Sequence, residues 1–208
     1  MSDPVRLKAG RRRVEISSPG KELFPSAGIT KQDLARYYIR ISDIALPLWR
    51  DRPLTMERYP DGIDASGFIQ KQKGDYFPDW IESARLEKEG GTVDYVLPQN
   101  AAIMAYLANQ GMITPHLGLS RIDEIKRPDR LIFDLDPSTD SFEPVREAAL
   151  IVREALEELG ATPFVMSTGS RGLHVVLPLD RSADFDAARR FAHSFADDLA
   201  QRYPDQLT

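Results

Sequence analysis

Two acidic residues, Asp134 and Asp136, stand at the end of the hydrophobic stretch RLIFDLD, residues 130–136. Side chains alternate between the faces of a β-strand, so both carboxylates share one face while Leu135 points to the other. Carboxylate oxygens at this spacing can hold one or two hard divalent cations such as Mg²⁺ or Mn²⁺. Pro137 ends the strand and leaves the acids at its carboxyl end, where α/β sheets bind ligands. We therefore interpret the pair as metal-binding and catalytic; two solvated acids that end a strand are the alternative.

A second candidate site is the segment STGSRGLHVV, residues 167–176, where a glycine-containing turn joins two predicted strands. Successive backbone N–H groups in such a turn can bind an anion. A guanidinium can hold phosphate oxygens, and hydroxyl and imidazole groups can add hydrogen bonds. The turn therefore predicts a binding site for a nucleotide triphosphate, formed by Thr168, Ser170, Arg171, Gly172 and His174. A hairpin turn with a solvated arginine is the alternative.

Two further groups of residues are less specific. A polar connector, TPHLGLSRIDEIKRPD, carries His116, Ser120 and Arg121, and its arginine could offset charge at the acidic site. A basic group in the first part of the chain is interleaved with aromatic residues, a combination that suits nucleic-acid ends. Its members are Lys21, Lys31, Arg52, Arg58 and Lys71, with Phe24, Tyr59 and Phe68 between them. Core aromatics beside surface lysines are the alternative.

The composition limits the classes of protein to consider. The chain has 208 residues, of which 42% are hydrophobic, and no cysteine, which excludes disulfides, thiolate zinc sites and cysteine nucleophiles. The net charge is −5, but residues 1–73 hold 14 Lys/Arg against 9 Asp/Glu, and residues 74–208 hold 13 against 23. A basic part beside an acidic part is compatible with a phosphate-binding surface next to a cation site. The sequence shows no signal peptide and no long apolar run, so we expect a soluble protein that is not exported.

Hydrophobic periodicity and turn residues predict alternating strands and helices. Residues 1–29 are rich in Pro, Gly and Ser and are expected to form an arm and loops. Thr30 is expected to cap a helix that Pro47 ends. The remaining predicted elements are strands at 53–59, 67–71, 92–97, 130–136, 163–168 and 173–179, and helices at 100–110, 143–159 and 184–203. The order indicates an α/β domain with a mixed sheet.

The sequence resembles the polymerase domain of bacterial DNA ligase D, a member of the archaeo-eukaryotic primase superfamily. Five blocks carry the resemblance in the family's order: SSPGKELFPSAGITKQDLARYY, RDRPLTMERYPDGIDASGFIQK, HLGLSRID, PDRLIFDLDPS and STGSRGLHVVLPL. The resemblance implies a mixed-sheet primase-polymerase fold. It also implies addition of ribo- or deoxyribonucleotides to DNA 3′ ends during non-homologous end joining. Residues 1–29 would be an arm with 5′-phosphate-binding loops, and residues 30–208 the primase-polymerase domain.

The resemblance also implies roles for individual residues. Asp134 and Asp136 match the acids that bind two Mn²⁺ or Mg²⁺ ions. Thr168, Ser170, Arg171, Gly172 and His174 match the triphosphate-binding loop, and His116 and Arg121 match residues near the incoming nucleotide. Lys21 and Lys31 match lysines that bind a 5′-phosphate, and Arg52, Phe68 and Lys71 belong to the DNA-binding set, with Ile69 where a second Phe is common. The implied partners are 5′-phosphorylated DNA ends, NTP or dNTP, Ku, and ligase or nuclease domains. The implied location is the bacterial cytoplasm, in association with the nucleoid.

One feature of the family has no counterpart. The family takes a third metal-binding aspartate from a strand after the last helix, and the printed sequence holds no such segment before Thr208. The sequence is therefore expected to lack the C-terminal strand, as a fragment of a longer enzyme that could be inactive alone. A non-catalytic module that binds DNA ends is the second hypothesis. A third is an aspartate-nucleophile phosphatase, because LIFDLDPS also resembles the first strand of that family.

Overall fold

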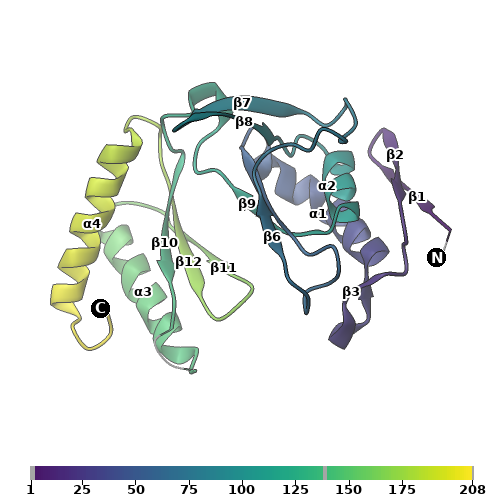
Figure 1. Ribbon diagram of the computed structural model, residues 1–208. Helices are drawn as coiled ribbons and strands as arrows, with labels where there is room; N and C mark the ends of the chain where they lie inside the picture. The colour runs from purple at the N-terminus through teal and green to yellow at the C-terminus, as the bar shows by residue number, and fades with distance from the viewer. Residues whose placement is uncertain (1–2, 138–139, 208) are drawn as a thin grey trace. The chain divides into compact units, whose positions relative to one another are not determined.

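The computed structural model describes residues 3–137 and 140–207, which pack as two units, Met1–Asp123 and Glu124–Thr208. The first unit holds a basic N-terminal part, two helices and a five-stranded sheet. The second holds a three-stranded sheet and two helices (Figure 1). No helix among the described residues is long and apolar enough to cross a bilayer.

The N-terminal residues form two β-hairpins, so the expectation of an arm with loops over residues 1–29 was wrong in its secondary structure. β1 (Val5–Ala9) pairs with β2 (Arg12–Ile16), and Gly10 adopts a positive φ of 59° in the two-residue turn between them. β3 (Glu22–Phe24) pairs with β4 (Ile29–Thr30) around a short 3-10 helix, η1 (Pro25–Ala27). Buried Val14 and Ile16 anchor β2 in the core, an anchor that the Gly- and Ser-rich composition conceals.

Helix α1 (Lys31–Trp49) begins at the predicted cap. The Thr30 side chain accepts a hydrogen bond from the Asp33 backbone N–H, and the Asp33 carboxylate accepts from the Thr30 N–H, which completes a capping box. Pro47 lies inside the helix rather than at its end. In the last turn a proline removes only one backbone hydrogen bond, and arginine side chains described below bind nearby carbonyls.

Helix α2 (Ala101–Asn109) packs against α1 in the core of the first unit. Its residues AAIMAYLAN are hydrophobic on every side, which is typical of a helix surrounded by protein. Asn100 caps it by accepting a hydrogen bond from the Ile103 N–H. At the other end the Asn109 side chain accepts from the Ser17 N–H over 2.9 Å, which ties β2 to the helix.

The five-stranded sheet of the first unit runs β6-β5-β8-β7, with β9 also paired to β5. Its strands are β5 (Leu54–Arg58), β6 (Phe68–Gln70), β7 (Ser83–Lys88), β8 (Gly91–Val96) and β9 (Met112–Leu117). The expectation of a polar connector over residues 114–129 was wrong for its first four residues, which include His116, because they belong to β9 and pair with β5. The strand was missed because Pro115 argues against a strand in a sequence. A proline is nevertheless tolerated in a strand at a position where its missing N–H would face no hydrogen-bond acceptor. β7 was also missed, because its exposed residues show no hydrophobic alternation.

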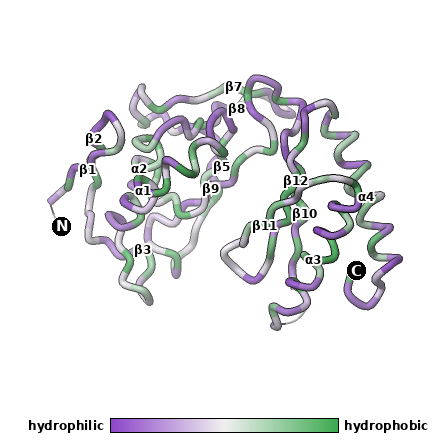
Figure 2. The backbone as a smooth tube through the Cα atoms, turned by 180° about the vertical axis from the view of Figure 1, so that it is seen from behind, coloured by the Kyte–Doolittle hydropathy of each residue, from purple (hydrophilic) through white to green (hydrophobic). Residues whose placement is uncertain are grey.

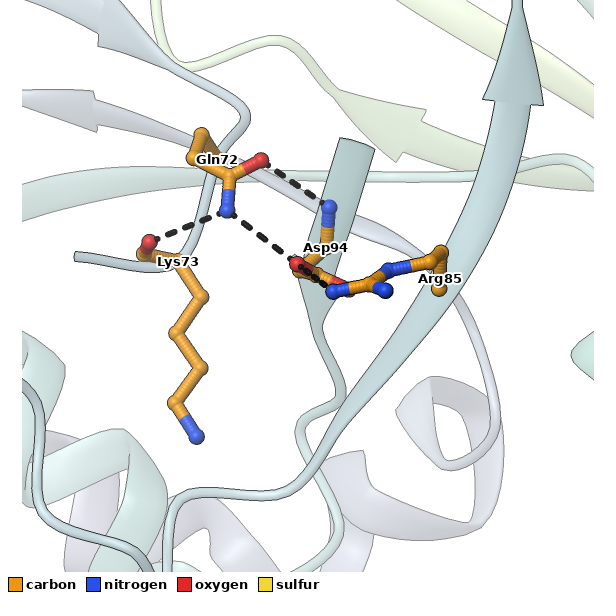
Figure 3. A network of polar contacts seen from close by, with 4 residues as sticks. All are labelled: Gln72, Lys73, Arg85 and Asp94. Carbon is orange, nitrogen blue, oxygen red and sulfur yellow. Dashed lines mark hydrogen bonds and ion pairs between the residues drawn. The ribbon is translucent and has the colours of Figure 1, made fainter. Parts of the chain in front are cut away.

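The chain after β6 is fastened to β8 by a small polar network (Figure 3). The Gln72 side chain accepts a hydrogen bond from the Asp94 N–H and donates to the Asp94 carboxylate. Arg85 on β7 donates to the same carboxylate through Nε and Nη2, over 2.9 and 3.0 Å. Lys73 adds a backbone hydrogen bond to Asp94 and a side-chain bond to the carbonyl of Ile81. The network fixes the segment that follows Lys71.

The second unit, preceded by the short 3-10 helix η2 (Ile122–Glu124), has the element order strand, helix, two strands, helix. Its elements are β10 (Arg130–Leu135), α3 (Glu143–Glu158), β11 (Phe164–Ser167), β12 (Leu173–Pro178) and α4 (Phe185–Arg202). β12 lies between β10 and β11 and is antiparallel to both. β10 and β11 therefore run in the same direction but are not paired with each other. The α/β class expected from the sequence is confirmed, whereas every strand pair among the described residues is antiparallel.

Both helices of this unit cover the same side of its sheet, as Figure 1 shows. Buried Val152 and Leu156 of α3 pack with Val175 and Leu177 of β12 and with Leu199 of α4. Hydrophobic and hydrophilic stretches alternate along α4 (Figure 2), as expected for a helix with one buried face. The two helices thus cover one face of the sheet. The polar side chain near the carboxyl end of β10, Asp134, lies on the opposite face.

Candidate functional site

Asp134 and Asp136 lie at the carboxyl end of β10, as the sequence predicts. Asp134 stands opposite His174 of β12, and His174 Nε2 lies 3.1 Å from an Asp134 carboxylate oxygen. Asp136 follows the strand, and both acids are exposed. Exposure removes the penalty of several kcal/mol or more that a buried, unpaired carboxylate pays. The pair therefore needs no internal cation, and its oxygens are accessible to ligands.

His174 is more buried than its acidic partner. Its side chain is 24% exposed, against 61% for Asp134. An ionised carboxylate only accepts hydrogen bonds, so the ring nitrogen that faces Asp134 carries the proton. The other ring nitrogen, Nδ1, is buried and has no hydrogen-bond partner among the described residues. His174 thus links the predicted triphosphate-binding segment to the first acid.

Gly172 brings the loop backbone against the second acid. A Cβ atom at this position would lie 2.8 Å from an Asp136 carboxylate oxygen and 2.7 Å from the carbonyl oxygen of Leu135. Carbon atoms essentially never approach that closely, so only glycine fits without a shift of the backbone or of the acid. Gly172 is therefore required because its backbone lies so close to Leu135 and Asp136, and not because its φ angle is positive.

The turn at residues 167–172 is closed by Thr168. Its hydroxyl donates to the Gly172 carbonyl over 3.1 Å and lies 3.2–3.3 Å from the N–H groups of Gly172 and Ser170, from which it accepts. Two of the N–H groups predicted to bind an anion therefore already have an internal acceptor. The Arg171 side chain extends outward and pairs with the exposed Asp140 over 3.0 Å. Exposed pairs of this kind are worth at most about 1 kcal/mol, so a phosphate can replace the carboxylate.

The donor atoms at this site fit a hard divalent cation. Asp134 and Asp136 offer oxygen ligands, which suit Mg²⁺ and Mn²⁺. Among residues 3–137 and 140–207, no group of three or more His, Cys, Asp or Glu side chains is placed to hold a metal ion. The described residues therefore supply two carboxylates, and the third expected from the resemblance is not among them.

His116 lies on β9, opposite Thr55 of β5. Its Nε2 atom is 2.9 Å from the Glu57 carboxylate, which also accepts a hydrogen bond of 2.6 Å from the Tyr59 hydroxyl. These bonds, first from Tyr59 and then from His116, hold the pKa of Glu57 below its ordinary value. The sequence reasoning missed Glu57; its i, i+2 spacing from Tyr59 on a strand was the pattern that could have revealed it.

Two arginines expected to bind ligands make hydrogen bonds at the C-terminal end of α1. Arg121 donates to the carbonyls of Arg50 and Pro47 over 2.7 and 3.1 Å. Arg52 is only 4% exposed and donates to the carbonyls of Leu48 and Gly118. Cationic side chains at a helix C-terminus satisfy carbonyls that the helix leaves without a partner. Both therefore stabilise the fold in this structure.

Lys21 and Lys31 are brought together by the β3–β4 hairpin. Glu22 pairs with Thr30, so the two lysines flank the base of the hairpin, where the Lys31 N–H donates to the Lys21 carbonyl. Burial and the nearby charge of Lys21 lower the pKa of Lys31. Lys21 is balanced by an ion pair of 2.6 Å with Asp61. Two cations this close are suited to a doubly charged anion such as a terminal phosphate.

The predicted DNA-stacking residues lie on β6. Phe68 is 47% exposed, and the guanidinium of buried Arg58 lies 5.2 Å from its ring centre. Arg58 itself is held by the Gln110 carbonyl and the side chains of Gln70 and Tyr76. Ile69 pairs with Glu57 and therefore points to the opposite face of the sheet from Phe68. Lys71 follows the strand and is exposed.

The chain is similar to known proteins of one family. A family model described as LigD, primase-polymerase domain, matches residues 30–208. The chain is 31% identical over 211 residues to the multifunctional non-homologous end joining DNA repair protein LigD of Mycobacterium tuberculosis, covering 96% of this chain and 28% of that protein. It is 29% identical to the bifunctional non-homologous end joining protein LigD of Bacillus subtilis, covering 100% of this chain and 33% of that one. The chain thus spans a third or less of the length of these relatives.

A solved structure is also similar over nearly the whole chain. It is the polymerase domain from Mycobacterium tuberculosis ligase D in complex with DNA, with a TM-score of 0.87 and 31% sequence identity. The alignment covers 92% of this chain and 70% of that one. The match extends far beyond the single strand on which the phosphatase hypothesis depends. The chain belongs to the LigD primase-polymerase domain family.

Proposed function

We propose that this chain provides the nucleotide-adding unit of a non-homologous end-joining polymerase, which extends DNA 3′ ends and fills gaps with ribo- or deoxyribonucleotides. The observation that carries the proposal is the Asp134–Asp136 pair, with Gly172 of the neighbouring turn and His174 of β12 in direct contact with it. Two accessible carboxylates beside a turn with an exposed arginine suit a metal-bound triphosphate. The family assignment supports the same reaction.

In the proposed reaction the protein mainly positions and neutralises its substrates. Asp134 and Asp136 would hold Mn²⁺ or Mg²⁺, and a bound divalent ion supplies charge neutralisation at the triphosphate and activation of the 3′-hydroxyl. Arg171 would exchange Asp140 for phosphate oxygens, and Thr168 keeps the turn closed. Orientation and electrostatics of this kind account for most of the catalysis in phosphoryl transfer.

The lysine pair at the base of the β3–β4 hairpin suits the other end of a DNA gap. A terminal 5′-phosphate carries more charge than the Asp61 carboxylate and would displace it from Lys21. Exposed Phe68 and Lys71 offer a stacking surface and a phosphate contact beside it in sequence. As partners we propose 5′-phosphorylated DNA ends, NTP or dNTP, Ku, and ligase or nuclease domains of the same or another chain.

Primer extension on gapped DNA with Mn²⁺ and ribonucleotides tests the proposal. In the full-length context we expect extension by the wild type, its loss in Asp134→Ala and Asp136→Ala, and nearly unchanged DNA binding in both variants. Asp180→Ala is a matched control, because it removes an acid of the same unit that only binds the N–H and hydroxyl of Ser182. Extension at wild-type rates by either site variant would refute the assignment.

A second candidate function is a DNA-end-binding module without catalysis. The observation in its favour is that the described residues supply two carboxylates and no third metal-binding side chain. The same experiment separates the two functions. Binding that depends on a 5′-phosphate, with no extension at any Mn²⁺ concentration, would support the module and overturn catalysis by this chain.

A further inference from the structure

The first unit contains a pocket of about 820 Å³, whose described lining residues include none of those assigned above to metal, nucleotide or DNA. It is bordered by the β1–β2 turn, one side of α1 and the first turn of α2. On α1 the lining residues follow a spacing of three or four positions and share one face of the helix; they are Ile39, Ser42, Asp43, Leu46 and Arg50. From the first to the last of them the helix rises about 16 Å. The pocket is therefore long enough for several residues of a bound chain.

The floor of the pocket is aliphatic. The Leu46 side chain lines it, and the small side chains of Ala9 and Ala101 leave the space beside it open. Ser42 is also part of the floor, but its hydroxyl already donates to the Ile39 carbonyl over 2.7 Å. No aromatic ring is among the described residues that line the pocket. The floor therefore suits an aliphatic side chain and offers no ring on which a nucleic-acid base could stack.

The rim of the pocket is basic, because three arginines line it. Arg11 lies in the β1–β2 turn, and the guanidinium of Arg12 lies 4.9 Å from the centre of the Trp80 ring. Arg50, at the C-terminal end of α1, donates through Nε to the Gln99 carbonyl over 3.0 Å. Within residues 3–137 and 140–207, none of the three forms an ion pair with a carboxylate. Their charges are therefore available to an anionic partner.

The charge and the length of the pocket indicate the kind of ligand. Asp43 is the one acid among the described lining residues, so three positive charges stand against one negative charge. Carboxylates can pair with guanidinium groups in a bidentate manner, and aliphatic side chains next to them would cover the floor. A nucleic acid could bind the arginines, but its bases would find no ring to stack on. An extended peptide of about five residues spans the length of about 16 Å.

We propose that the pocket binds an acidic segment of a partner protein, with an aliphatic side chain on the floor and carboxylates at Arg11, Arg12 and Arg50. Arg12 and Arg50 are already held by the Trp80 ring and the Gln99 carbonyl, so less side-chain entropy is lost when they bind. Binding needs neither Mn²⁺ nor a nucleotide, because every described lining residue belongs to the first unit and none is an acid of the metal site. The pocket thus gives the chain a protein-docking site in addition to its proposed reaction.

Peptide selection tests the chemistry of the partner. A phage library of random short peptides is selected on the immobilised full chain, without metal or nucleotide. We expect to recover sequences in which Asp or Glu flanks Leu, Ile or Val. One such peptide is then synthesised with a fluorescent label and titrated by fluorescence anisotropy. Replacing its acids by Asn or Gln, or its aliphatic residue by Ser, should each weaken binding about tenfold, because charge pairs or a buried side chain are lost.

Arg11→Glu tests whether that peptide lies in the pocket. Arg11 is exposed in a turn, so the variant should fold and melt like the wild type. Its affinity for the peptide should fall about tenfold, because an attraction becomes a repulsion. Arg13→Glu is the matched control, since it makes the same change of charge at an exposed position of the same hairpin that does not line the pocket. Its affinity for the peptide should stay close to that of the wild type.

A loss of peptide affinity in Arg11→Glu alone supports the docking site. Equal peptide affinities of Arg11→Glu and Arg13→Glu would overturn it, and so would a library that yields no acidic and aliphatic sequences. DNA is titrated with the same two variants. If Arg11→Glu selectively weakens DNA binding and leaves peptide binding unchanged, the pocket binds nucleic acid and the assignment of a protein partner is wrong.

Discussion

At the scale of single residues, the geometry of the acidic site depends on how closely the Gly172 backbone approaches Asp136. Asp134 is oriented by His174, whereas Asp136 is bordered by the bare Cα of Gly172. One acid thus has a side-chain partner and the other a backbone neighbour. Both carboxylates remain exposed and are accessible to ligands.

Gly172→Ala is predicted to disturb both the fold and the site. The added methyl group would meet Asp136 and the Leu135 carbonyl at 2.7–2.8 Å, and overpacking of this kind costs about 1–3 kcal/mol. Urea unfolding should show that loss. Gly20→Ala is the control, because nothing lies within 4 Å of a Cβ there and its φ is unexceptional. Equal stability of the two variants would contradict the close approach.

The lysine pair makes a separate prediction. Lys21→Ala and Lys31→Ala should each weaken binding of 5′-phosphorylated DNA ends by roughly tenfold, the loss of one charge-assisted hydrogen bond. Binding of the same DNA with a 5′-hydroxyl should change little. Lys88→Ala, an exposed lysine on β7, is the control in a fluorescence anisotropy titration. Equal losses of affinity for 5′-phosphorylated and 5′-hydroxyl DNA would show that the two lysines do not bind the 5′-phosphate.

At the scale of elements, the N-terminus of α1 joins stability to the lysine site. The capping box fixes Thr30, and the next residue is Lys31. Replacing a Thr cap by Ala costs about 0.5–2 kcal/mol. We expect Thr30→Ala to lower the melting temperature and to weaken phosphate-dependent DNA binding. A lower melting temperature with unchanged binding would mean that the cap stabilises the helix without positioning the lysine.

The same box gives a pH dependence. Hydrogen bonds from the Thr30 side chain and backbone hold the pKa of Asp33 below its ordinary value of 3.8. The folded state therefore favours the ionised carboxyl, and this contribution is complete above 3.8 and is lost as the pH falls through the lower, folded value. The wild type should lose more stability on acidification below pH 4 than Asp33→Asn does. Parallel curves in urea unfolding would contradict the assignment.

Some elements could be read from the sequence and others could not. The strand that ends beside Asp134 and Asp136 is a local hydrophobic run, and the start of α1 has a local capping box, so the strand and the start of the helix were predicted correctly. Arg52 and Arg121 bind backbone carbonyls at the C-terminal end of α1. These contacts depend on how the chain packs, and the spacing of residues in the sequence does not predict them. The Glu57–His116 contact likewise depends on the β5–β9 register, and Pro115 in β9 concealed that pairing.

At the scale of the whole molecule, charge is distributed unevenly. Residues 1–73 carry an excess of basic residues, and the rest of the chain carries an excess of acidic ones. DNA affinity should therefore depend strongly on salt despite the net charge of −5. For about three to five phosphate contacts, counterion release predicts a loss of roughly 40- to 500-fold between 50 and 200 mM salt. Affinity that is independent of salt would contradict a phosphate-binding first unit.

The most direct test of the account is a Mn²⁺ titration of the labelled full chain, with a ribonucleoside triphosphate present, followed by NMR. Bound Mn²⁺ broadens nearby amide signals. We predict selective broadening at Asp134, Asp136 and residues 172–174, its absence in Asp134→Ala, and its persistence in Asp180→Ala. Broadening centred elsewhere, or an unchanged pattern in Asp134→Ala, would contradict the claim that these two acids and the adjoining loop form the metal–nucleotide site.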